Sequence, residues 1–268
     1  MANVIELKDI SKIYGFGESS VVALDAINLE VEKGEFVAIM GPSGSGKSTL
    51  MNLIGLLDRA SHGLYKLDGR DVSKLRPSRR AKVRRDNVGF IFQSFNLIPG
   101  LTVIENVALP LAYKGMTLVR RLKKASEVLA KINMTDREYY FPRQLSGGQA
   151  QRAAIARALV NWPSIVLADE PTGNLDSATS LQIMELLKDI NEGGNTILMV
   201  THNPELTRYA TRVIYMKDGQ VQYDEELRKG EAVDLDEVPA AVEYEQELLG
   251  KKAPKKKRRR IQNGGRRR

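Results

Sequence analysis

The sequence contains no cysteine among its 268 residues. A chain without cysteine can form neither a disulfide framework nor a metal site built from thiolates. The absence fits a reducing compartment.

Long apolar stretches are missing as well. Runs such as Phe36–Met40 and Ile165–Ala168 extend over only a few residues, whereas a membrane-spanning helix needs roughly 18 or more. The first residues, Met1–Glu6, lack the basic and apolar regions of a signal peptide. We therefore expect a protein that is soluble by itself and cytoplasmic.

The net charge of +8 is mostly a property of the last part of the chain. Residues 251–268 carry eleven Lys or Arg and no acid, while residues 224–247 carry ten Asp or Glu against two basic residues. This change of composition predicts a domain at 1–223 and an acidic-then-basic extension at 224–268. We expect part of 225–249 to be helical and 250–268 to be disordered.

Predicted strands and helices alternate along residues 1–223. Period-two alternation and short apolar runs predict strands at Val4–Leu7, Ile27–Val31, Phe36–Met40, Val88–Phe92, Ile165–Ala168, Thr196–Val200, Val213–Met216 and Val221–Tyr223. Helices are predicted at Lys47–Leu57, over most of 102–133 with a break near Lys114-Gly115, at Ala150–Val160 and at Ser177–Ile190. The last of these should bury the stripe Leu181, Met184, Leu187 and Ile190. The alternation predicts an α/β fold with a mostly parallel sheet.

The first glycine-rich stretch follows a predicted strand and opens a predicted helix. It reads Gly41-Pro42-Ser43-Gly44-Ser45-Gly46-Lys47-Ser48 and fits the pattern G-x-x-x-x-G-K-[ST]. Backbone N–H groups of such a loop wrap phosphates, and the start of the helix adds its positive end. Lys47 would reach the β- and γ-phosphates and Ser48 would hold Mg²⁺, with Thr49 next in the loop-to-helix junction. The stretch predicts ATP binding.

Two adjacent carboxylates end the apolar strand at Ile165–Ala168. Asp169 at the strand tip would anchor Mg²⁺, and Glu170 would act as the general base for the attacking water. Solvated acids at the end of a strand are common, so this interpretation depends on the glycine loop upstream.

The second glycine-rich stretch is Leu145-Ser146-Gly147-Gly148-Gln149. Ser146 and Gln149 have the spacing of a capping box. That role leaves the paired glycines unexplained, because glycine inside a helix costs roughly 1 kcal/mol per residue relative to alanine. Bare N–H groups at a helix start attract an anion, so we expect a phosphate to approach Gly147 and Gly148.

Together these motifs resemble those of ABC-transporter ATPase subunits, over most of residues 3–223. The two glycine stretches resemble that family's Walker A and signature sequences, and Ile165–Glu170 resembles its Walker B. Further matches are Gln93 at the Q-loop, Asp176 in the D-loop, His202 as the switch histidine and Tyr14 as the aromatic that stacks on adenine. The implied fold is a P-loop NTPase core with a mostly parallel sheet, a small antiparallel β subdomain and a helical subdomain that carries the signature motif.

The resemblance implies a mechanism as well. Two copies would pack head to tail, so that ATP on one Walker A loop is covered by the signature turn of the other copy. Glu170 would activate water, His202 would contact the γ-phosphate, and Gln93 would help to bind Mg²⁺ and relay closure to an integral membrane permease. Asp176, Ser146 and Gln149 would belong to the nucleotide-binding surface.

A finer resemblance is to the macrolide-export and lipoprotein-release subfamily, carried by Asp169–Ser177, Phe92–Pro99 and Met51–Asp58. Ala150 stands where that family usually has glutamine. Coupling to a cell-division complex stays open as a variant, and action on nucleic acid or the ribosome is the less favoured alternative. For the basic tail three interpretations remain: a solvated tail without a partner, contact with anionic lipid, and nucleic-acid attraction.

Overall fold

The structure is a computed structural model that describes residues 2–15, 20–228 and 230–242, and within them it contains two β-sheets. The antiparallel sheet has the order β2-β1-β4-β5, and the larger sheet has the order β10-β9-β3-β8-β7-β6. The strands are β1 (Asn3–Tyr14), β2 (Val21–Glu32), β3 (Phe36–Met40), β4 (His62–Leu67), β5 (Arg70–Asp71), β6 (Val88–Phe92), β7 (Ile165–Asp169), β8 (Thr196–Val200), β9 (Arg212–Lys217) and β10 (Gln220–Glu226).

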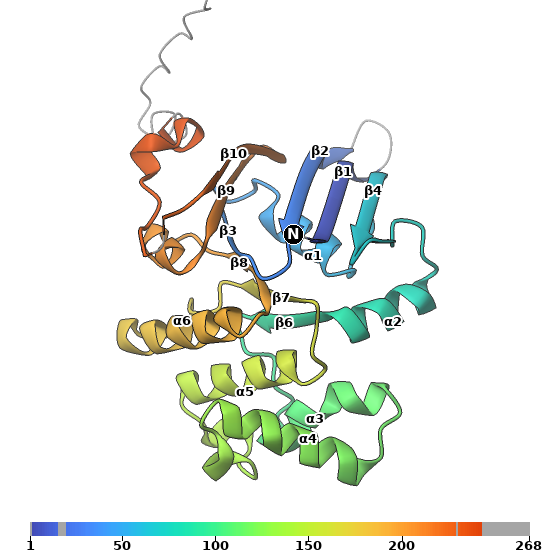
Figure 1. The fold of residues 1–268 in the computed structure, drawn as a ribbon, viewed down its shortest axis with the longest axis vertical. Helices are drawn as coiled ribbons and strands as arrows, with labels where there is room; N and C mark the ends of the chain where they lie inside the picture. Colours follow the sequence, from blue (N-terminus) through green and yellow to red (C-terminus); the bar gives the residue numbers. More distant parts are fainter. Residues whose placement is uncertain (1, 16–19, 229, 243–268) are drawn as a thin grey trace, which may run out of the picture.

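A layer of helices covers one side of the larger sheet, and the four-stranded sheet lies on the other side (Figure 1). The helix at 47–54 lies on that second side, between the sheets, because Leu50 and Ile54 share a core cluster with buried side chains of both sheets. The helices are α1 (Lys47–Ile54), α2 (Pro77–Asn87), α3 (Val103–Tyr113), α4 (Leu118–Lys131), α5 (Gly147–Leu159) and α6 (Ser177–Glu192). Short 3₁₀ helices include η2 (Thr135–Arg137), η3 (Pro142–Gln144), η4 (Pro204–Tyr209) and η5 (Leu235–Glu237). In the described residues, no helix combines the length and hydropathy needed to cross a membrane.

The larger sheet is parallel from β9 through β3, β8 and β7 to β6, and only β10 runs antiparallel to its neighbour. Every residue of β3 and β8 is buried. A strand covered on both faces buries all its side chains, which is why continuous apolar runs identified these strands. The predicted parallel sheet is confirmed.

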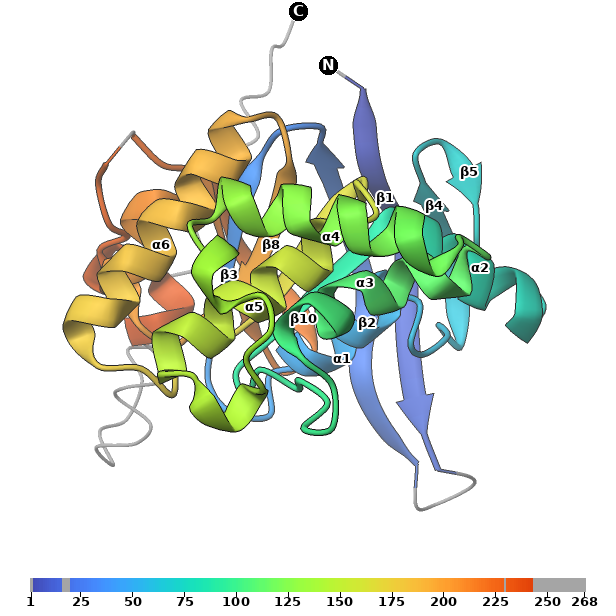
Figure 2. The same ribbon diagram turned by 90° about the horizontal axis from the view of Figure 1, so that it is seen from below.

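The helices α3, α4 and α5 form a separate layer, most visible from below (Figure 2). They share a core of their own that includes Val107, Leu129 and Ala153. The predicted break between α3 and α4 is confirmed: α3 ends at its C-cap Lys114, and Gly115 has a φ of 77°. Glycine adopts this left-handed conformation without steric cost.

Several predicted boundaries were wrong. The helix after the first glycine loop ends at Ile54, not Leu57, because Leu56 turns left-handed with a φ of 57°. The strands β1 and β2 span twelve residues each, longer than predicted, and register shifts along their pairing break the regular alternation. On α6, Leu181 is 51% exposed, contrary to the predicted stripe, and the buried residues are Ile183, Met184 and Leu187.

The predicted division of the chain at 223/224 falls inside β10, which continues to Glu226. Beyond it, Val233, Val238, Ala240 and Ala241 are buried in the same core cluster as the α6 side chains. Residues 239–242 are helical, in line with the helix expected within 225–249. The disorder predicted for 250–268 concerns residues outside the described part.

Gly89 allows α5 to pack directly on β6. A Cβ atom at this position would lie 2.5 Å from the carbonyl oxygen of Ala158 in α5. We expect Gly89→Ala to lower the free energy of unfolding by about 1–3 kcal/mol, because overpacking forces the backbone apart. Urea denaturation measures this. Gly100→Ala is the matched control, since nothing lies within 4 Å of a Cβ there; equal stability of the two variants would contradict the packing argument.

Candidate functional site

Four loops that carry predicted site residues leave neighbouring strands at one edge of the larger sheet. Gly41 follows β3, Thr201 follows β8, Glu170 follows β7 and Gln93 follows β6, and these strands are neighbours in that order. Because the four strands are parallel, their carboxyl ends meet. Ligands of open α/β sheets bind at this edge.

The loop at residues 41–46 is shaped by close contacts that only glycine permits. Gly41 and Gly46 have φ values of 141° and 99°. A Cβ on Gly41 would lie 2.1 Å from the carbonyl oxygen of Met216, and one on Gly46 would lie 2.6 Å from that of Ala23. Ser45 is buried and its carbonyl accepts a hydrogen bond of 3.1 Å from the N–H of Gly219. The loop is therefore fixed against both sheets.

Lys47 folds back into this loop. Its Nζ donates to the carbonyl oxygens of Gly41 at 2.8 Å and Pro42 at 2.7 Å. Burial lowers the pKa of Lys47, while the negative charges of Glu170 and Asp169 act in the opposite direction. The ammonium group thus lies between the loop and both carboxylates, where a phosphate would find a positive charge.

The remaining loop residues lie around Lys47. Ser43 and Gly44 are exposed at the tip of the loop, Ser48 is exposed and Thr49 is half-buried in the first turn of α1. The first turn of α1 contains no acidic residue that would compete with an anion for its free N–H groups.

Asp169 and Glu170 differ in their surroundings although they are adjacent. Burial, followed by the charge of Glu170, raises the pKa of Asp169, and Lys47 opposes this shift. Glu170 has a left-handed φ of 45°, and its N–H donates to the carbonyl of Val200 at 3.0 Å. Such a conformation costs a non-glycine residue about 1–3 kcal/mol and is often found at functional sites.

His202 lies next to Glu170. The distance from its Nδ1 to Oε1 of Glu170 is 3.2 Å, and the histidine side chain is 71% exposed. The structure thus pairs the predicted base with the predicted switch histidine, although 32 positions separate them in the sequence.

Gln93 packs against the turn that follows Glu170. A Cβ on Gly173 would lie 2.5 Å from Nε2 of Gln93, and Asn174 donates from Nδ2 to the backbone carbonyl of Gln93 at 3.0 Å. Asp176, which ends this turn, is the N-cap of α6, and its carboxylate accepts from the N–H of Thr179 at 2.9 Å. The hydrogen bonds from Thr179 lower the pKa of Asp176.

The signature turn forms the predicted capping box at the start of α5. Oγ of Ser146 accepts from the N–H of Gln149 at 3.3 Å, and Oε1 of Gln149 accepts from the N–H of Ser146 at 3.0 Å. The glycines also have a packing role that the sequence did not reveal: a Cβ on Gly148 would lie 2.5 Å from Cγ2 of Thr179. Gly147 is exposed, and a Cβ on it would lie 3.0 Å from Cδ2 of Leu175.

Tyr14 lies at the end of β1, and its side chain is 42% exposed. Its hydroxyl donates to Oδ2 of Asp58 at 2.8 Å, and Nζ of Lys12 lies 4.6 Å from the centre of the ring. Partial burial and the bond to Asp58 raise its pKa, and Thr49 acts in the opposite direction on the same hydroxyl. Stacking of this ring on adenine stays a prediction.

Two residues of α5 that sequence reasoning missed join the signature helix to the other loops. Gln151 is fully buried and donates from Nε2 to the carbonyl of Pro171 at 2.5 Å. Arg157 donates to the carbonyls of Phe95, at 2.8 Å, and Asn96. Their position just after the signature motif was the available signal, but their partners are backbone atoms that no sequence pattern marks.

A family model described as ABC transporter matches residues 24–173. The macrolide export ATP-binding/permease protein MacB of Hyphomonas neptunium is 49% identical over 221 residues, which cover 82% of this chain and 34% of that protein. This chain therefore spans about a third of the length of MacB. The ABC transporter ATP-binding protein YvrO of Bacillus subtilis is 49% identical over 222 residues, covering 83% of this chain and 97% of that protein.

Among solved structures, the fold is similar to a dimeric, post-hydrolysis state of the ATP-binding cassette MJ0796 bound to ADP and phosphate, a protein of Methanocaldococcus jannaschii. The TM-score is 0.76 at 48% identity, with 84% of this chain and 99% of that chain covered. The family model and these relatives confirm the resemblance drawn from the motifs: the chain belongs to the ABC transporter family and is one of its ATP-binding cassettes.

Proposed function

We propose that two copies of this chain pack head to tail around ATP, hydrolyse it and thereby drive a transmembrane partner. The observation that carries the proposal is the meeting of the Lys47 loop, Asp169, Glu170 and His202 at one sheet edge, with the signature turn placed apart from them. Ser146–Gln149 packs against Leu175 and Thr179, beyond the turn that follows Glu170. A second copy is needed to bring such a turn onto the phosphates held by Lys47.

The residues present fit Mg²⁺ as a cofactor. The half-buried carboxylate of Asp169, the hydroxyl of Ser48 and the amide oxygen of Gln93 are oxygen ligands, which Mg²⁺ prefers. No group of three or more His, Cys, Asp or Glu side chains suited to a metal exists among the described residues. Mg²⁺ is usually held by one or two carboxylates together with substrate phosphates, and when bound it would neutralise charge on the β- and γ-phosphates.

The protein's own groups then perform the reaction. Lys47 exchanges its loop carbonyls for phosphate oxygens, and the N–H groups of the glycine loop hold the same phosphates. Glu170 takes a proton from water as the water oxygen bonds to the γ-phosphorus and the bond to the bridging oxygen breaks, which leaves ADP and phosphate. His202 orients Glu170 and contacts the γ-phosphate from the neighbouring strand end.

A groove beside Gln93 suits a segment of the membrane partner. It encloses about 670 Å³ between α2, α3 and β6, with Phe90, Phe92 and Leu109 among its apolar walls and Lys82 and Arg85 at its side. Asn96, whose carbonyl is held by Arg157 of α5, also lines it. A partner seated here would touch both the Gln93 loop and the signature helix. The fusion of ATP-binding and permease parts that the name of MacB describes supports such a partner.

The same proposal places the chain at the cytoplasmic face of a membrane, attached through its partner. The eleven basic residues of 251–268 lie outside the described residues. Near an anionic leaflet each basic residue contributes about 1 kcal/mol of attraction, so we propose that this tail adds a lipid contact. It takes no part in hydrolysis.

The first test is Glu170→Gln. We expect ATP turnover to fall about 10²–10⁴-fold, since general-base catalysis contributes that much, while ATP still binds and closed dimers accumulate. Phosphate release and light scattering after size-exclusion chromatography measure the two effects. Glu127→Gln on the exposed side of α4 is the isosteric control; normal turnover by Glu170→Gln would show that the base is another group.

The second test is Lys47→Ala, which should act on affinity. Loss of the ammonium group removes a charge-assisted bond to phosphate, and we expect the Kd for ATP to rise at least about tenfold. Isothermal titration calorimetry measures it, with Lys124→Ala on the surface as control. Unchanged affinity would contradict the assigned role of the glycine loop.

The third test removes the tail by ending the chain after Gly250. ATP turnover of the isolated protein should stay unchanged, while binding to vesicles that contain anionic lipid should weaken and become less sensitive to salt. Vesicles of zwitterionic lipid are the control. A large fall in turnover would refute the separation of tail and catalysis, and undiminished vesicle binding would refute the lipid contact.

A further inference from the structure

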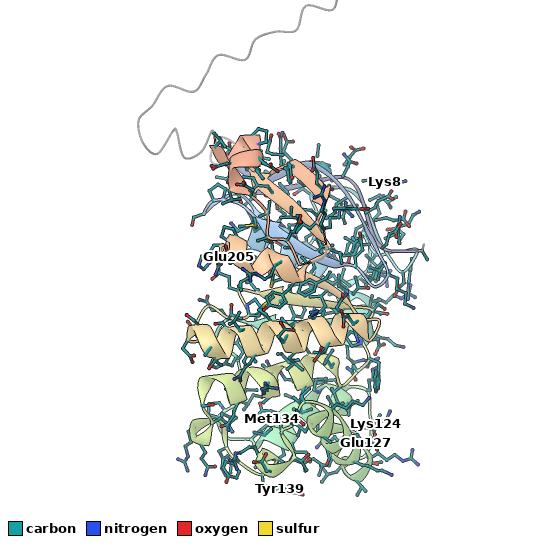
Figure 3. The ribbon with its side chains drawn as sticks, turned by 60° about the vertical axis from the view of Figure 1, so that its left-hand side comes forward. Lys8, Lys124, Glu127, Met134, Tyr139 and Glu205 are labelled. Carbon is teal, nitrogen blue, oxygen red and sulfur yellow. The ribbon has the colours of Figure 1, made fainter. Side chains whose placement is uncertain are left out.

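The described residues 227–228 and 230–242, here called the C-terminal strap, fold back over η4. The N–H of Leu227 donates to the carbonyl of Thr211 at 2.9 Å, and the N–H of Val233 donates to Oγ1 of Thr207 at 2.8 Å. Val233 and Val238 are buried in one core cluster with Leu206 of η4. Figure 3 labels Glu205 in the first turn of η4, on the side of the molecule where the strap lies and away from Tyr139 in the helical layer.

Thr207 is the residue through which the strap holds η4. It is fully buried. Its hydroxyl donates to the carbonyl of Pro204 at 2.6 Å while it accepts from Val233. If the hydroxyl were lost, the buried N–H of Val233 and the half-buried carbonyl of Pro204 would be left without this partner, which is costly for a buried polar group. The strap and the start of η4 are therefore fastened at one side chain.

The start of η4 in turn fixes the backbone around His202. Asn203 caps η4: its Oδ1 accepts from the N–H of Glu205 at 3.0 Å, and its carbonyl accepts from the N–H of Leu206 at 3.2 Å. The N–H of Asn203 donates to Oγ1 of Thr201 at 3.1 Å. His202 stands between these two anchored residues.

His202 has little packing of its own to hold it. Its side chain is 71% exposed and meets Glu170 at 3.2 Å. A cavity of about 420 Å³ is lined by Glu170, His202 and Leu206 together, so η4 forms a wall of the space beside this pair. The position of the ring therefore depends on the backbone that η4 fixes.

We propose that the C-terminal strap is a positioning element for His202, acting through Thr207 and the cap of η4. This proposal rests on the proposed ATPase function. It adds that residues after β10 help to set the distance between His202 and Glu170. Thr207 is fully buried and would act through His202.

The test compares Thr207→Val, which keeps the shape and loses the hydroxyl, with Thr207→Ser, which keeps the hydroxyl. We expect Thr207→Val to lower kcat about fivefold, the effect of one lost net hydrogen bond, with KM for ATP unchanged, and Thr207→Ser to restore kcat. Thr135→Val on the exposed surface of η2 is the control. A folded Thr207→Val protein with the kcat of the parent would overturn the proposal, as would an equal loss in Thr207→Ser.

A double-mutant cycle separates positioning from general destabilisation. If the strap acts through His202, Thr207→Val should have no further effect on kcat in a His202→Ala background. A fivefold loss of kcat in the His202→Ala background, or an effect of Thr207→Val on KM alone, would show that the strap supports the fold without positioning His202.

If the Thr207→Val protein does not fold, Val233→Ala can replace it, because it loosens the same contact and leaves the Thr207 hydroxyl intact. The same cycle then applies, with a smaller loss of kcat expected. The proposed ATPase function fails only if the parent protein does not hydrolyse ATP, which the parent control measures separately.

Discussion

The parallel pairing of β3, β8, β7 and β6 is the constraint on which the rest of the molecule depends. These strands are short and almost completely buried, so their register is fixed by packing on both faces. Parallel strands end at the same edge, and each one here leads into a loop that carries a proposed site residue. The parallel pairing therefore brings four groups to one edge of the sheet: the phosphate loop, the two carboxylates, His202 and Gln93.

Several residues at the site have unfavourable backbone conformations or unpaired polar atoms, which the packing of the core compensates. Glu170 has a left-handed backbone, and the carbonyls of left-handed Phe95 and Asn96 are held by Arg157 from the signature helix. Gln151 is buried with its Oε1 lacking a hydrogen-bond partner within the described part of the chain. Such features are costly, and here they gather at the contacts between α5 and the ends of β6 and β7. These contacts connect the groove proposed for the partner with the turn proposed to face the second copy.

Much of this architecture could be predicted because it depends on local rules. Buried strands appear as apolar runs, Gly115 marks a helix end, and Ser146 and Gln149 form the capping box that their spacing indicates. Contacts between distant segments could not be predicted. The spacing of Leu181 predicted a core residue, but the buried face of α6 contains Ile183, Met184 and Leu187 and leaves Leu181 exposed. The packing of Gly148 against Thr179, the pair Glu170–His202 and the strap over Thr207 exist only after the sheet has formed, and the sequence carries no periodic signal for them.

We propose that ATP lies between the lysine loop of one copy and the signature turn of the other. A crystal structure of the Glu170→Gln protein with ATP and Mg²⁺ tests it most directly. We expect a two-fold dimer in which Ser146 and the N–H groups of Gly147 and Gly148 from one copy lie within hydrogen-bond distance of the γ-phosphate bound to Lys47 of the other copy. A nucleotide-loaded structure with the signature turn facing solvent would contradict it.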